Sequence, residues 1–135
     1  MENLRYIISF LITAIIFLLL DALWLGIIAQ SLYQEHLGTI INLEFNFYFA
    51  GLFYLIYIFG MIYFAEINHS NWKKSLKRGI ILGGLCYATY DFTNWATIKD
   101  WPYFIVIIDV VWGMLITGLT AGLSSWILSK ITIKS

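Results

Sequence analysis

Three aspartates stand within apolar stretches of this 135-residue sequence, where a carboxyl group is costly. Asp21, Asp91 and Asp109 each lie in a separate hydrophobic run, and no lysine, arginine or histidine stands beside them in these runs. A carboxylate at the centre of a membrane-spanning helix costs about 2.5–3.5 kcal/mol. A site built from these residues would therefore hold protons, a cation, or a ligand that supplies positive charge or hydrogen-bond donors.

Polar and aromatic side chains share helical faces with these acids. Asn94 follows Asp91 by three residues, so helical spacing puts the amide on the same face as the carboxyl. Indole N–H groups and phenol hydroxyls can donate hydrogen bonds to a carboxylate. The candidate ligand- or ion-binding residues are Asp21, Asp91, Asn94 and Asp109, with Trp24, Tyr54, Tyr57, Tyr87, Thr93 and Trp112 in support.

The composition indicates which elements must position these residues. Hydrophobic residues make up 61% and charged residues 12% of the chain, whereas a soluble domain is about half apolar and about a quarter charged. The net charge of zero excludes a nucleic-acid-binding surface and a polybasic membrane anchor. Cys86 is the single cysteine, so no internal disulfide can form. With one proline and no linker-like segment, residues 1–135 form a single transmembrane domain.

Four apolar stretches are each long enough to cross a bilayer, which takes about 20 residues. They run approximately over 4–29, 45–65, 79–98 and 102–130. The sequence thus predicts an all-α integral membrane protein, with four transmembrane helices in an antiparallel bundle. Counted at 1.5 Å per residue, the three carboxyls lie about 10–12 Å below the outer ends of their helices.

The basic residues predict the orientation of this bundle. Seven of the eight lysines and arginines fall at the N-terminal flank, between the second and third stretches, or at the C-terminal end, and only Lys99 falls in the opposite connections. Because cytoplasmic loops carry the excess of basic residues, both termini are expected in the cytoplasm.

Packing and loop features follow from small and apolar residues. Gly79 with Gly83, and Gly118 with Gly122, form small-xxx-small pairs that let helix backbones approach closely. The first outer connection, 30–44, is long enough for an interfacial helix. Its apolar face would consist of Leu32, Tyr33, Leu37, Ile40 and Ile41.

Four segments carry a family pattern: LDALWLG at 20–26, FYLIYIFG at 53–60, YATYDFTNWAT at 87–97 and DVVWG at 109–113. Together they resemble the signatures of a bacterial family of small predicted membrane proteins, domain-of-unknown-function family 2177. The resemblance spans nearly the whole chain. It implies a multi-pass protein of the bacterial inner (cytoplasmic) membrane with four helices, and it implies no activity.

Three classes of function stay open at this point. The carboxylate cluster could bind or transport protons, a cation, or a small polar or lipid headgroup ligand from the outer side, and four helices would then favour a homodimer. A membrane enzyme could act on lipid through aspartate acid–base chemistry, or through Mg²⁺ or Mn²⁺ on Asp21, Asp91 and Asp109. An accessory subunit could pair its acids with basic residues of a larger membrane-protein partner. Buried aspartates can also serve only to join helices by hydrogen bonds.

A catalytic triad is not among these classes. Cys86 points about 140° around its helix from Asp91, and His36 and His69 fall outside the apolar stretches. No cofactor is required by the sequence, although a divalent cation would suit three carboxylates.

Overall fold

The regular structure of the protein is helical. The computed structural model describes residues 2–28, 30–37 and 46–131. Its elements are α1 (Glu2–Leu23), the π-helical turn η1 (Trp24–Ile28), α2 (Gln30–Leu37), α3 (Phe47–Phe64), α4 (Trp72–Thr97) and α5 (Tyr103–Lys130). Two asparagines begin long helices: Asn46 accepts hydrogen bonds from the backbone of Tyr48 and Phe49, and Asn71 accepts one from Lys74. Such side-chain caps satisfy backbone donors that have no partner within the helix.

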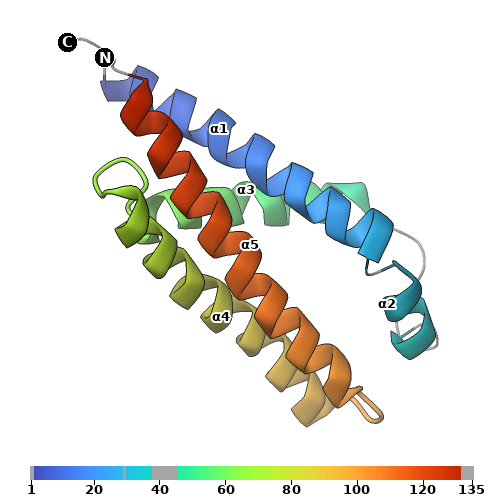
Figure 1. The fold of residues 1–135 in the computed structure, drawn as a ribbon. Coiled ribbons are helices and arrows are strands. Elements are labelled where there is room, and N and C mark those ends of the chain that lie inside the picture. Colours follow the sequence, from blue (N-terminus) through green and yellow to red (C-terminus); the bar gives the residue numbers. More distant parts are fainter. Residues whose placement is uncertain (1, 29, 38–45, 132–135) are drawn as a thin grey trace.

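α4 and α5 form an antiparallel hairpin whose backbones touch along glycines (Figure 1). A Cβ atom on Gly83 would lie 2.0 Å from the carbonyl oxygen of Gly113, and one on Gly79 would lie 2.6 Å from that of Thr117. Gly118 is equally tight, since its Cβ would meet Ile80 at 2.5 Å. The predicted small-residue packing of the third and fourth stretches is therefore confirmed.

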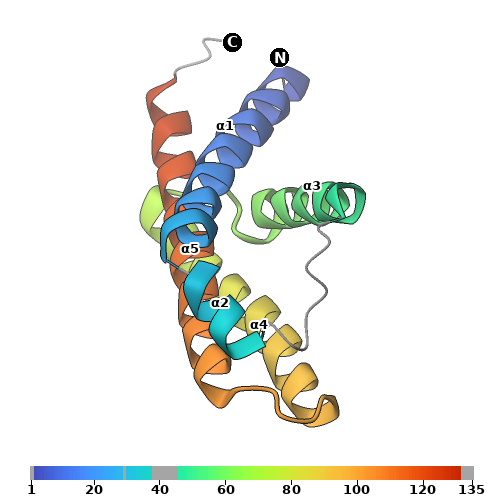
Figure 2. The same cartoon turned by 90° about the vertical axis from the view of Figure 1, so that its right-hand side faces the viewer.

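α3 is arranged differently from the other long helices. α5 lies between α1 and α4, and these three run roughly alongside one another, whereas α3 lies across them (Figures 1 and 2). The expected antiparallel four-helix bundle is therefore not confirmed. The surface of α3 that packs against the other helices includes large residues such as Tyr57 and Met61.

One end of the molecule gathers both termini of the helical part and the connection between α3 and α4. The Arg5 guanidinium donates to the backbone oxygen of Asn68 at 3.1 Å, and Ser125 donates to that of Ser70 at 2.9 Å. Arg78 pairs with Glu66 at 3.2 Å. The segments that carry most of the basic residues therefore meet at one end, and the connections at the other end carry Lys99.

The connection between α1 and α3 contains a short helix. α2 covers Gln30–Leu37, and Leu32 packs against Trp101, Ile105 and Val106 at the end of the α4–α5 hairpin where these two helices connect. The other residues of the predicted apolar face lie outside the described part of the chain: the side chains of Tyr33 and Leu37, and residues Ile40 and Ile41.

Three helices of the described residues are long and apolar enough to cross a membrane: Glu2–Ile27, Phe47–Phe64 and Tyr103–Lys130. α4 has 26 residues, so its length is sufficient, but its first two turns hold Lys73, Lys74, Lys77 and Arg78. Asp91 and Asn94 lower its mean hydropathy further. The third predicted span, 79–98, therefore does not stand out by hydropathy, because α4 carries these charged and polar residues.

Candidate functional site

Asp21 lies on α1, one turn before η1, and it faces α3 and α5. Its carboxylate accepts a hydrogen bond from the hydroxyl of Tyr54 on α3. The indole of Trp112 on α5 lies beside the same carboxyl. The structure therefore brings together three of the predicted residues, one from each of three helices, and a phenol hydroxyl neutralises part of the cost of burying Asp21.

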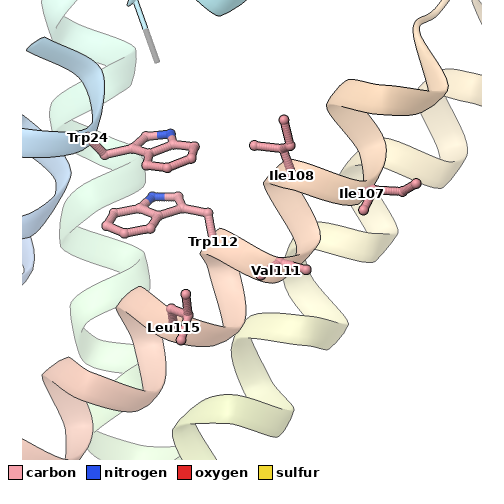
Figure 3. Close-up of a pocket in the computed structure, with 6 residues that line it drawn as sticks. All are labelled: Trp24, Ile107, Ile108, Val111, Trp112 and Leu115. Carbon is pink, nitrogen blue, oxygen red and sulfur yellow. The ribbon is translucent and has the colours of Figure 1, made fainter. Parts of the chain in front are cut away.

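The two tryptophans that follow aspartates by three residues stack on one another. The ring centroids of Trp24 and Trp112 are 4.4 Å apart and their planes differ by 8° (Figure 3). Both indole N–H groups are buried, and neither completes a hydrogen bond within the described residues. The stack fixes α1 against α5 at the level of Asp21. Beside it is an apolar hollow of about 250 Å³ lined by Trp24, Ile107, Ile108, Val111, Trp112 and Leu115.

Asp91 is the least solvent-exposed of the three acids. Its exposed fraction is 0%, and neither carboxylate oxygen has a hydrogen-bond partner in the part of the chain that the structure describes. The indole of Trp101, from the connection between α4 and α5, lies close to the carboxyl without completing a hydrogen bond. Asp91 is thus an enclosed carboxyl with an aromatic neighbour and no cation.

Asp109 lies on α5, one turn before Gly113, and is 7% exposed. It makes no hydrogen bond or ion pair within residues 2–28, 30–37 and 46–131. One turn further along, the ring of Tyr87 fills the space beside Gly113, where a Cβ atom would lie 2.2 Å from the ring. Asp109 is therefore buried without a partner, as Asp91 is.

The three carboxyl groups do not converge. No group of three histidine, cysteine, aspartate or glutamate side chains among the described residues is close enough together to hold a metal ion. Figure 1 shows α5 between α1, which carries Asp21, and α4, which carries Asp91. Asp21, Asp91 and Asp109 therefore do not form, among the described residues, the group of three that the expected shared divalent cation would need.

The remaining predicted residues divide into two groups. The Tyr57 hydroxyl lies 2.8 Å from that of Thr117, and the rings of Tyr57 and Tyr87 meet at 6.3 Å, so both belong to the interior. Thr93 is exposed and donates to the backbone oxygen of Tyr90 at 3.0 Å. Asn94 lies beside Tyr90. Thr93 and Asn94 are therefore not brought to the carboxyl of Asp91.

A family model for predicted membrane proteins, DUF2177, matches residues 6–126, which include all three acids and most of the four long helices. The chain belongs to the DUF2177 family of predicted membrane proteins. Comparison with curated proteins and with solved structures finds no match. The resemblance expected from the four sequence segments is thus confirmed, and membership of DUF2177 carries no activity with it.

This DUF2177 chain also has buried polar residues that the sequence analysis did not select. Four hydroxyl side chains on α1 and α5 are fully buried at spacings of four residues: Ser9, Thr13, Thr120 and Ser124. The signal was present in the sequence, because small polar residues four apart in an apolar helix mark one inward face. Trp101, which was not among the predicted site residues, is also buried, and it lies beside Asp91.

Proposed function

We propose that this DUF2177 protein crosses the bacterial inner membrane four times, with both termini in the cytoplasm, and binds protons at separate intramembrane carboxyls. The glycine contacts of α4 with α5 support a fourth span, because a helix whose backbone touches α5 for most of its length has to accompany α5 into the bilayer. The gathering of the basic segments at one end supports the orientation.

The single observation that carries proton binding is the burial of Asp91. Its side chain has no exposure to solvent, and neither of its two oxygens completes a hydrogen bond or an ion pair within the described chain, although the indole of Trp101 lies close by. An isolated carboxylate in an apolar interior is far less stable than the neutral acid, so such a group takes up a proton. Asp109, also unpartnered, falls under the same reasoning.

The surroundings of the carboxyls also favour a proton over a divalent cation or a basic residue of a partner protein. Divalent cations prefer several oxygen ligands together, and no three acidic, histidine or cysteine side chains of the described residues form such a group. A lysine or arginine of a partner protein could reach an exposed carboxyl, but Asp91 is enclosed by its own chain. A proton is the one ligand that a single enclosed carboxyl can hold alone.

The test is infrared difference spectroscopy of the purified protein in lipid nanodiscs. At neutral pH, a protonated-carboxyl band should be present in the wild type and should lose intensity in Asp91→Asn. The matched control is Asp100→Asn, an exposed aspartate at φ 62°, a backbone conformation that asparagine tolerates. It should leave the band unchanged. Proton binding at Asp91 is overturned if Asp91→Asn and the wild type have the same spectrum in this region.

A further inference from the structure

Buried hydroxyls extend from the level of the acids toward the end that holds the termini. On α5, Asp109, Gly113, Thr117, Thr120 and Ser124 follow one another at spacings of four, four, three and four residues, which places them on one helical face. All five are buried. A single face of α5 thus begins at a carboxyl and continues as hydroxyls.

α1 supplies a second set of hydroxyls at matching levels. The Trp24–Trp112 stack fixes the register of the antiparallel helices α1 and α5. Thr13 lies 11 residues before Trp24, while Thr120 and Ser124 lie 8 and 12 residues after Trp112. Thr13 is therefore level with the segment from Thr120 to Ser124. We call Ser9 and Thr13 of α1 with Thr117, Thr120 and Ser124 of α5 the hydroxyl track.

Both ends of the hydroxyl track are connected to other polar groups. Toward the acids, Thr117 lies 2.8 Å from the hydroxyl of Tyr57. Toward the other end, the Asn68 amide donates to Ser9 at 3.1 Å, and the backbone oxygen of Asn68 accepts from Arg5. Asn68 belongs to the connection between α3 and α4, which is cytoplasmic under the proposed orientation.

The hydroxyls in the middle of the track have no partner. Thr13, Thr120 and Ser124 are fully buried, and none of their hydroxyl oxygens makes a hydrogen bond within the described residues. Two threonines on the exposed face of α4 do form hydrogen bonds with the backbone of their own helix. Thr89 donates to the carbonyl of Leu85 at 2.6 Å, and Thr97 donates to that of Thr93 at 2.8 Å. Helical geometry offers the same bond to the buried hydroxyls, which nonetheless remain free to donate and accept.

We propose that the hydroxyl track conducts protons between Asp109 and the cytoplasmic end of the protein. A hydroxyl can accept a proton on an oxygen lone pair and release its own proton to the next acceptor. The neutral Asp109 carboxyl gives up its proton and becomes a carboxylate, each hydroxyl or intervening water passes one proton on, and one proton leaves beside Asn68. Proton number and charge balance at every step, and the carboxylate is reprotonated from the outer side.

This path rests on the proposed binding of protons, so the experiment is chosen to distinguish a failure of the path from a failure of proton binding. The protein is reconstituted into vesicles loaded with a pH-sensitive dye, and proton flux after an external pH jump is followed with the membrane potential clamped by potassium and valinomycin. The wild type should admit protons faster than protein-free vesicles. The double variant Thr120→Val/Ser124→Ala should reduce the protein-dependent flux about tenfold, as expected when a relay loses a hydrogen-bonded step.

The matched control is Thr89→Val/Thr97→Val, which removes two exposed hydroxyls and should leave the flux unchanged. If the double variant of the track does not fold, Thr120→Val is compared with Thr120→Ser, and only the serine variant should conduct. Equal flux in the wild type and the track variants, or no flux above protein-free vesicles, overturns the path. The protonated-carboxyl band of the wild type then decides separately whether proton binding stands.

Discussion

The α4–α5 hairpin and the α1–α3 side of the molecule bury carboxyl groups in opposite ways. In the hairpin, glycine backbones touch, and Asp91 and Asp109 are enclosed without hydrogen bonds within the described residues. On the other side, aromatic rings separate the helices, and Asp21 accepts a hydrogen bond from Tyr54. The comparison shows that a nearby donor is not sufficient: the indole of Trp101 lies close to Asp91 without completing a hydrogen bond, whereas Tyr54 completes one to Asp21.

The two sides also differ in what holds them together. Along the hairpin, small residues allow van der Waals contact over many turns, which is the main attraction between helices in lipid. α3 is held by larger side chains, among them Phe17 of α1, whose ring lies 5.9 Å from that of Tyr54 and 5.3 Å from that of Tyr57. We therefore expect the hairpin to be rigid and α3 to be the more easily displaced helix.

The largest effect is expected from a substitution that separates α4 from α5. Gly83→Leu would place a Cβ atom 2.0 Å from the Gly113 carbonyl, with the rest of the side chain beyond it, so the helices would have to separate. We expect little monodisperse protein after purification in mild detergent. Gly51→Leu is the control, since a Cβ atom there meets nothing within 4 Å. Similar yields of both variants, measured by size-exclusion chromatography, would refute the claim that glycine contact holds α4 to α5.

The sequence predicted the glycine contacts between α4 and α5 but not the neighbours of the three acids. Glycine spacing correctly predicted the hairpin seam, because close approach is a local property of two helix faces. Counting residues placed the acids in one layer, but depth says nothing about direction around the helix axis. Asp21 and Asp91 thus share a predicted level and still have different neighbours, Tyr54 and Trp101, since the order in which helices pack is set by the whole molecule.

The polar interior was also only partly predictable. Tyr54 was expected to donate to a carboxylate, and it does. Asn94 was placed on the face of Asp91 by spacing, yet the Asp91 carboxyl accepts no hydrogen bond within the described residues, and Thr93 donates to the backbone oxygen of Tyr90 instead. The tilt of α3 has no local signal, since it results from competing contacts with three other helices.

A smaller effect is expected from substitutions in the Trp24–Trp112 stack, which joins the end of α1 to α5. If the Trp24–Trp112 stack fixes this contact, Trp24→Leu and Trp112→Leu should be coupled by about 0.5–1.5 kcal/mol in a double-mutant cycle of unfolding by sodium dodecyl sulfate. The pair Trp72→Leu and Trp126→Leu, both exposed, provides the reference cycle and should show no coupling. Additive effects at Trp24 and Trp112 would mean that the stack contributes no stability of its own.

The smallest expected effect concerns the one acid that has a donor. Tyr54→Phe removes the hydroxyl that donates to Asp21 and keeps the ring against Phe17, so it should lower the free energy of unfolding by about 0.6–1.5 kcal/mol. Tyr63→Phe, on the exposed side of α3, is the control and should change little. Asp21 would then resemble Asp91, a carboxyl with an indole beside it and no completed hydrogen bond, and the protonated-carboxyl band at neutral pH should gain intensity. An unchanged band together with unchanged stability would show that the hydrogen bond from Tyr54 does not distinguish the two sides, and that the carboxyls differ only in their burial.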